Sequence, residues 1–132
     1  KTRVLLAVSL VKDRAETILD FWKLMKYLFY APEMFNEKAL RKLSEKTKHI
    51  LEKGEKIARD LKKETPTGGG ERLIEQSLDW ANKNNIKSGQ IMMTLRLALV
   101  GGLHGIDLKK IISFIGANEA SSRFRRLRKA LD

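Results

Sequence analysis

Apolar residues recur at helical spacing along nearly the whole chain, and this periodicity limits the possible folds more than any other feature of the sequence. The clearest example runs from about residue 13 or 17 to Tyr30. Its apolar face carries Ile18, Phe21, Trp22, Met25, Leu28 and Phe29. The alternation of apolar and polar residues that indicates strands is nearly absent. Proline, which breaks helices, occurs only at positions 32 and 66. The sequence therefore predicts an all-α fold.

Further helices are predicted over residues 1–11, 36–63, 73–84, 88–100, 107–115 and 118–131, with a break in the second of these near Gly54. Asn36, Asp107 and Asn118 stand where helices are expected to begin. Their short side chains can accept hydrogen bonds from the exposed amides of a first turn, so we expect them to be N-caps.

The segment TPTGGG, residues 65–70, interrupts this helical pattern. Three consecutive glycines can form a flexible joint or a tight loop. As a phosphate-binding loop the segment is a weak match, because no Lys-Ser or Lys-Thr pair follows it. We therefore expect two helical subdomains, residues 1–66 and 67–132, packed as a superhelical bundle.

The chain is strongly basic, with 27 Lys and Arg against 16 Asp and Glu, a net charge of +11 and a pI near 10.0. Such a balance favours a polyanionic partner, either nucleic acid or an acidic membrane surface. The alternative is a charge excess that serves solubility only. No apolar run approaches the roughly 20 residues that cross a bilayer, so we expect no membrane span.

The last predicted helix is the most basic element. Five of the seven residues from 123 to 129 are basic: Arg123, Arg125, Arg126, Arg128 and Lys129. The planar fork of an arginine can bind two phosphate oxygens at once. Alternatively, most of these charges are solvated or paired with carboxylates.

The sequence predicts no catalytic or metal site. The chain has no cysteine, and its two histidines, His49 and His104, do not have a metal-binding spacing. His49 lies in a charged helix and is expected at the surface, whereas His104 lies in a glycine-rich turn, where it either contacts RNA or is simply exposed. No nucleotide-binding loop or Ser-His-Asp pattern occurs.

Arg96 lies in the middle of a predicted helix among apolar neighbours. An arginine in such surroundings needs a partner or a special role. One interpretation is an ion pair with Asp107 or another carboxylate. The other is recognition of an unpaired base, which an arginine can contact by hydrogen bonds or by stacking.

Two segments resemble the anticodon-binding region of bacterial glutamyl-tRNA synthetases. The segment 86–108, IKSGQIMMTLRLALVGGLHGIDL, is similar to the family's Lys-x-Gly opening, Pro-Leu-Arg-x-Ala-Leu-Thr-Gly helix and Gly-Pro-x-Leu turn. The segment 10–29 is similar to its Lys-x-Arg-x-x-Thr-Leu stretch and the aromatic helix that follows. The C-terminal pattern also agrees, and is carried by Gly116, Arg123, Arg126, Ala130 and Leu131. The chain departs from the family at Thr94, Val100 and Ile106, which puts the turn geometry and some base contacts in question.

The resemblance implies a role for particular residues. Arg96 would face the anticodon bases, helped by the turn around Gly105, Ile106 and Leu108. Arg14 matches an arginine that, in discriminating members, helps to reject glutamine tRNA. The remaining residues that the resemblance suggests for tRNA binding are Lys87, His104, Arg123 and Arg126.

The resemblance also implies that the chain is a domain of a longer, cytoplasmic and monomeric enzyme that attaches glutamate to tRNA(Glu). ATP and Mg²⁺ would belong to an N-terminal catalytic domain, so this region would be non-catalytic and would need no cofactor. Two other hypotheses remain open. One is a general basic helical module that binds nucleic acid or proteins, and the other is a structural appendage whose recognition surface has degenerated.

Overall fold

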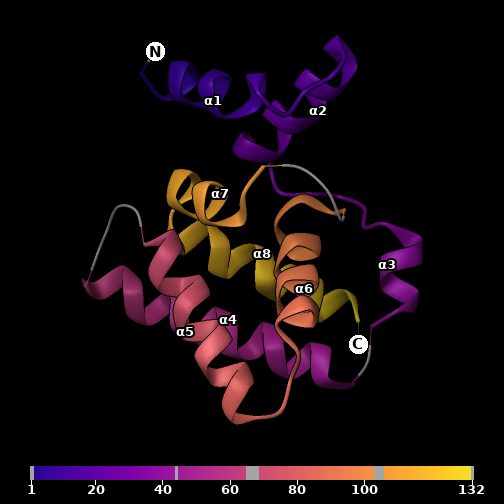
Figure 1. Ribbon diagram of the computed structural model, residues 1–132, viewed down its shortest axis with the longest axis vertical. Coiled ribbons are helices and arrows are strands. Elements are labelled where there is room, and N and C mark those ends of the chain that lie inside the picture. Colours follow the sequence, from indigo (N-terminus) through magenta and orange to yellow (C-terminus); the bar gives the residue numbers. More distant parts are fainter. Residues whose placement is uncertain (1, 44, 65–68, 103–105, 132) are drawn as a thin grey trace.

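The computed structural model describes residues 2–43, 45–64, 69–102 and 106–131, and these ranges contain eight helices and no strand (Figure 1). The helices are α1 (Thr2–Lys12), α2 (Ile18–Phe29), α3 (Glu37–Arg41), α4 (Glu45–Glu64), α5 (Gly70–Lys83), α6 (Ser88–Val100), α7 (Leu108–Ile115) and α8 (Ala117–Ala130). The predicted all-α fold is confirmed. None of the helices in these ranges is both long enough and apolar enough to cross a membrane.

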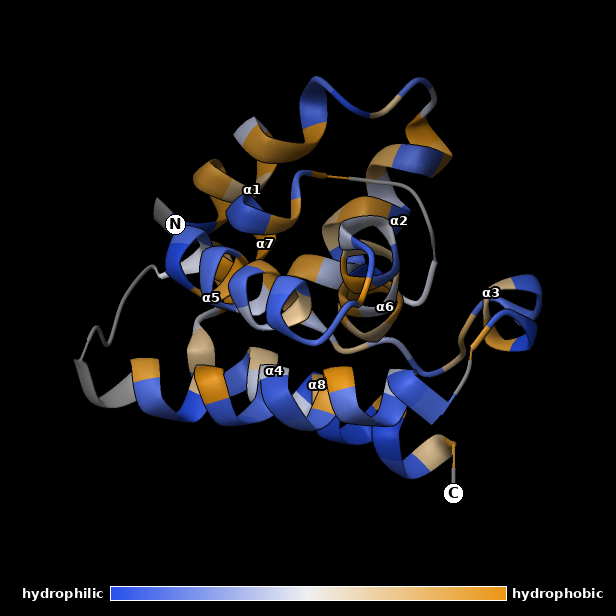
Figure 2. Ribbon diagram, turned by 60° about the horizontal axis from the view of Figure 1, so that its bottom comes forward, coloured by the Kyte–Doolittle hydropathy of each residue, from blue (hydrophilic) through white to orange (hydrophobic). Residues whose placement is uncertain are grey.

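Helices α4 and α8 pack side by side at one face of the molecule, and α5, α6 and α7 lie over them (Figure 2). The apolar side of α4 faces the helices that it contacts, and its charged side faces outward (Figure 2). From α4 the core receives Ile50, Leu51, Ile57, Ala58 and Leu61. Burying an apolar face of this kind is the main force that holds a helix in place.

The prediction of a helix break near Gly54 is wrong, because α4 is continuous through it. A Cβ at Gly54 would lie 3.3 Å from Phe124 Cδ2 and 3.4 Å from Leu95 Cδ2. The glycine therefore allows α4 to approach α8 and α6 closely. The start of this helix was also predicted wrongly, since the chain forms the short α3 before α4 begins at Glu45.

The expected N-caps differ in outcome. Asn36 Oδ1 accepts a hydrogen bond from Ala39 N at 3.0 Å, and Asp107 Oδ1 accepts one from Lys109 N at 2.9 Å, so both predicted caps are confirmed. The prediction for Asn118 is wrong, because α8 already begins at Ala117 after Gly116.

Helices α1 and α2 pack against each other at one end of the molecule, next to α7 (Figure 1). Phe114 of α7 is the contact point. Its ring meets the Phe29 ring edge-on with a centroid distance of 5.6 Å, and the Arg3 guanidinium lies 4.5 Å from its centroid. Large apolar side chains also remain exposed on these two helices: Val4, Leu5, Leu6, Ile18, Leu19, Trp22 and Phe29.

The boundary between residues 66 and 67 stays a prediction about domain organisation. Residues 65–68 lie outside the described ranges. The packing crosses the boundary, because α4 from the first predicted half contacts α5, α6 and α8 from the second. Directly after it, Gly70 N donates a hydrogen bond to Ser113 Oγ at 3.1 Å. A Cβ at Gly70 would collide with the Lys109 carbonyl oxygen, so a glycine is needed where α5 meets α7.

Candidate nucleic-acid interface

Arg96 lies on the second half of α6 and is half-buried. Its Nη1 donates a hydrogen bond of 2.7 Å to the carbonyl oxygen of Ile106, the residue before the N-cap of α7. This bond uses one of the five N–H donors of the guanidinium. The side chain therefore links α6 to the residue that precedes the cap of α7, and its guanidinium is only half-buried there.

Charges of both signs surround Arg96. Burial lowers the pKa of Arg96, the Asp107 carboxylate counteracts this effect, and the Arg14 cation lowers the pKa further. The guanidinium stays charged at neutral pH because its ordinary pKa lies far above 7. Both interpretations of Arg96 drawn from the sequence thus have support, since Asp107 lies close enough to act on it and the side chain is only half-buried.

Arg14, which is far from Arg96 in the sequence, contributes to the charge around Arg96. It lies in the turn between α1 and α2, where its backbone N–H donates to Val11 O at 2.9 Å, and its side chain is exposed. After burial and the opposing effect of Asp107, the cation of Arg14 is the third influence on the pKa of Arg96, and it lowers that pKa. Arg14 thus adds a second positive charge to the surroundings of Arg96, next to the negative charge of Asp107.

Gly101 fixes the geometry where α6 ends. It has a φ of 75°, in the left-handed region, and its N–H donates to Leu97 O at 2.8 Å. The segment between α2 and α3 crosses directly over it, and Asn36 N donates to Gly101 O at 2.8 Å. A Cβ at this position would lie 2.6 Å from Met34 O. The C-terminal end of α6 is thus tied to the segment between α2 and α3.

The guanidinium of Arg123 is buried and bonded to groups of the protein itself. The side chain is 1% exposed, and it donates three hydrogen bonds within the protein. Its Nε donates to Glu119 Oε2 at 2.8 Å, and its Nη1 donates to Tyr27 O at 2.6 Å and to Leu99 O at 2.8 Å. Burial lowers the pKa of Arg123, the neighbouring Glu119 opposes this, and Arg126 adds to it. This guanidinium joins α8 to the C-terminal ends of α2 and α6.

Two further arginines of α8 are paired with one buried acid. Arg125 Nε lies 2.9 Å from Glu55 Oε1, and Arg128 Nη2 lies 3.2 Å from Glu55 Oε2. Burial alone would raise the pKa of Glu55, but hydrogen bonds and charges from the two arginines outweigh it, so the pKa lies below its ordinary value. For these residues, the alternative of paired rather than phosphate-binding charges is the one that the geometry supports.

Residues 1–130 match the protein family described as "Anticodon binding domain". The chain belongs to this family. Among its relatives, the glutamate–tRNA ligase of Flavobacterium johnsoniae is 33% identical over 124 residues, which cover 94% of this chain and 24% of the relative. That of Christiangramia forsetii is 36% identical over 126 residues, which cover 95% of this chain and 24% of the relative.

A crystal structure of a glutamate tRNA ligase from Elizabethkingia meningosepticum in complex with its amino acid has a TM-score of 0.81 and 30% sequence identity. The match covers 100% of this chain and 26% of that one. The chain is therefore an anticodon-binding domain of the glutamate–tRNA ligase type, as the resemblance indicated. It spans about a quarter of the length of the curated relatives it matches.

Within the anticodon-binding domain, Arg96 is bonded to the residue before the cap of α7, and Arg14 lies near enough for its charge to influence Arg96. The side chains of Ile106 and Leu108 are only 3% and 1% exposed, so these residues can support the turn but cannot offer apolar side chains to a base. The predicted contacts of His104 and Gly105 fall outside the described residues.

Three other predicted contacts lie away from this cluster. Lys87 is exposed at the N-terminus of α6, about 13 Å along the helix from Arg96 at 1.5 Å per residue. Arg126 is exposed on α8. For Arg123 the prediction of an RNA contact is corrected, because its guanidinium is sealed in the core. Its pairing with Glu119 had a signal in the sequence, since residues four apart are neighbours on a helix.

The departures from the family pattern also lie in the interior. Thr94, Val100 and Ile106 are 0%, 5% and 3% exposed. Their side chains therefore pack against the core beside the α6–α7 turn instead of facing a ligand. His49, in contrast, is exposed on α4, as predicted.

Proposed function

We propose that this domain recognises the anticodon of tRNA(Glu) on behalf of a longer glutamate–tRNA ligase. The observation that carries the proposal is the convergence of Arg14 and Arg96 beside the α6–α7 turn in a chain of the anticodon-binding family. Arg96 hydrogen-bonds to or stacks on an unstacked anticodon base, and the exposed lysines and arginines attract the phosphates without regard to sequence.

In this proposal the longer enzyme attaches glutamate to tRNA(Glu) with ATP and Mg²⁺ at a catalytic domain outside this chain, and it acts as a monomer in the cytoplasm. The domain itself contributes binding and discrimination and no chemistry. Arg14 serves to reject glutamine tRNA, because its cation stands next to Arg96 where a base would be recognised.

The test is a binding titration of the domain with tRNA(Glu) and with the same tRNA carrying an altered anticodon. We expect the native tRNA to bind more tightly, with an affinity that falls steeply with salt. Arg96→Ala should reduce the difference between the two tRNAs more than it reduces total binding. The matched control is Arg59→Ala, which removes an exposed arginine of α4 and should leave the discrimination intact.

Equal binding of the two tRNAs by the wild-type domain would reject base recognition. It would favour the alternative of a general basic module, which predicts equal affinity for any RNA of the same charge. The structure offers that alternative less support, because Arg123, Arg125 and Arg128 are occupied by partners within the protein.

A further inference from the structure

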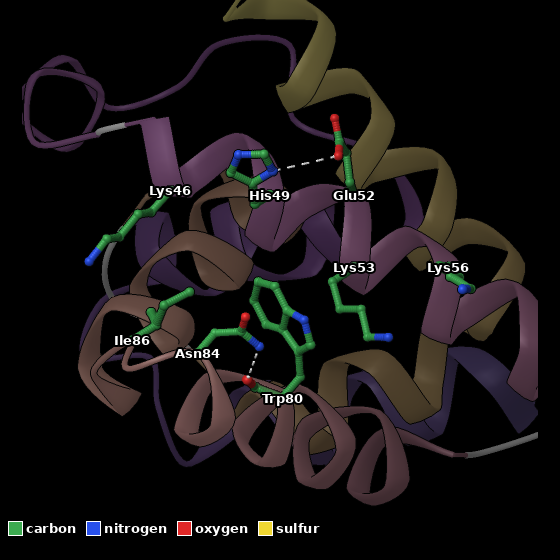
Figure 3. A pocket seen from close by; sticks show the side chains of 8 residues that line it. All are labelled: Lys46, His49, Glu52, Lys53, Lys56, Trp80, Asn84 and Ile86. Carbon is green, nitrogen blue, oxygen red and sulfur yellow. Dashed lines mark hydrogen bonds and ion pairs between the residues drawn. The ribbon is translucent and has the colours of Figure 1, made fainter.

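A groove of about 550 Å³ lies between α4 and α5, on residues that play no part in the proposed anticodon site. Helix α4 lines one side with Lys46, Lys53 and Lys56, and α5 lines the other with Trp80 and Asn84 (Figure 3). Such a volume lies within the range of small-ligand sites, roughly 300–1,000 Å³. The groove therefore has room for a group the size of a nucleotide.

The α4 side of the groove is cationic. Its three lysines are seven and three residues apart, spacings that place side chains on one face of a helix. Lys46 and Lys56 are exposed and Lys53 is half-buried. Glu52 is the one acid that lines the groove within the described chain, and its carboxylate is directed to His49, 3.9 Å away. The groove thus keeps an excess of positive charge.

The α5 side is aromatic and polar. The half-buried indole of Trp80 rises from α5 into the space between Lys53 and Asn84 (Figure 3). Asn84 Nδ2 donates to Trp80 O at 2.8 Å, which holds the amide at the rim of the groove with its oxygen as a further acceptor. Ile86, 8% exposed, adds an apolar surface to the lining on the side of Asn84 (Figure 3).

We infer that this groove binds a single-stranded RNA segment at a second site, separate from anticodon recognition. One base stacks on the Trp80 indole, and the adjoining phosphates lie along Lys46, Lys53 and Lys56. An aromatic side chain beside a row of cations is the arrangement that binds single strands without sequence preference. An acidic peptide would satisfy the lysines but has no flat base for the indole, so RNA fits the lining residues better.

The test uses the chain with Trp22→Phe, which leaves Trp80 as the only indole because the sequence contains two tryptophans. A short oligouridylate should quench the fluorescence of Trp80 in a saturable titration. Lys53→Ala together with Lys56→Ala should weaken binding and reduce the slope of log affinity against log salt by about 1.4, at roughly 0.7 per lost phosphate contact on a single strand. The control pair Lys38→Ala with Lys42→Ala removes two exposed lysines outside the groove and should leave both quantities nearly unchanged.

Trp80→Leu should weaken binding of a dye-labelled oligouridylate about fivefold or more, since base stacking is lost. If this variant does not fold, the Trp80 fluorescence titration and the Lys53→Ala, Lys56→Ala variant still test whether the groove binds RNA. The inference is overturned if oligouridylate leaves Trp80 fluorescence unchanged, if the control pair is as harmful as the groove pair, or if polyglutamate of equal charge binds equally well. Arg96→Ala should not alter the quenching, so failure of this second site is distinguishable from failure of anticodon recognition.

Discussion

Arg96 Nη1 lies 2.7 Å from the carbonyl oxygen of Ile106, and this bond ties the middle of α6 to the residue that precedes the cap of α7. The side chain that we propose for base recognition thus also links α6 to the start of α7. A guanidinium can serve both purposes because its donors point in several fixed directions.

The first prediction separates the charge of Arg96 from its shape. Arg96→Lys keeps a cation but loses the planar fork, so the domain should retain most of its salt-dependent attraction to tRNA and lose discrimination between anticodons. Titrations of native and anticodon-altered tRNA(Glu) at two salt concentrations measure both effects. Full discrimination by the lysine variant would mean that charge alone suffices.

The second prediction concerns the proximity of Arg14 and Arg96. If both act on the same part of the anticodon, Arg14→Ala and Arg96→Ala should be non-additive in a double-mutant cycle, with a coupling energy of about 0.5–3 kcal/mol in tRNA binding. The control cycle pairs Arg96→Ala with Arg59→Ala on α4 and should be additive. Additivity in the first cycle would place the two arginines in separate contacts.

The third prediction contrasts a buried and an exposed arginine of α8. Arg123→Met leaves Tyr27 O and Leu99 O without their donor, so we expect a loss of about 3 kcal/mol or more in the free energy of unfolding. Arg126→Met, three residues along the same helix and exposed, should change it by about 0.5 kcal/mol or less. Urea denaturation measures both. Similar free energies of unfolding for the two variants would contradict a stabilising role of the buried hydrogen bonds of Arg123.

The fourth prediction concerns glycines at the two ends of α6. Gly101→Ala should destabilise the fold by at least about 1 kcal/mol, because a side chain is strained at a φ of 75° and its Cβ would meet Met34 O. Gly89→Ala, at a position where a Cβ meets nothing within 4 Å, should be stabilising by about 0.5–1 kcal/mol. Thermal unfolding of the two variants compares them, and opposite signs are expected.

The fifth prediction is a pH dependence that originates at Glu55. The pKa of Glu55 is lower in the folded chain than its ordinary value of 4.5, so the ionised carboxylate stabilises the fold above that pH. This contribution to stability is lost as the pH falls through the lower pKa that Glu55 has in the folded chain. Glu55→Gln should therefore cost about 1–3 kcal/mol at neutral pH, and its difference from wild type should shrink in acid. A constant difference from neutral to strongly acidic pH would contradict the pairing with Arg125 and Arg128.

Periodicity and capping residues were sufficient to predict most of the helices, because a buried apolar stripe and a short polar cap are both local properties of the sequence. Gly54 shows where local reasoning fails. A glycine lowers helix propensity, but here the close approach of Phe124 outweighs that cost and keeps α4 continuous. This contact joins residues that are far apart in the sequence, so a local pattern does not predict it.

Sequence reasoning also predicted only part of the candidate site. Arg96 was identified from its apolar surroundings, whereas nothing in the sequence indicated that the charge of Arg14 acts on it. Arg123 was misplaced because a basic residue in a basic helix looks solvated. Its carbonyl partners, Tyr27 and Leu99, belong to other helices, and no pattern in the sequence connects them to it.

The position of Arg123 has a consequence for specificity. Its guanidinium holds the last turn of α6 against the last turn of α2, the helix that follows Arg14 in the chain. A buried residue thus helps to fix α2 relative to α6, the helix that carries Arg96. If the proposed recognition is correct, we expect changes at this interior position to alter the discrimination between anticodons while the residues at the surface stay the same.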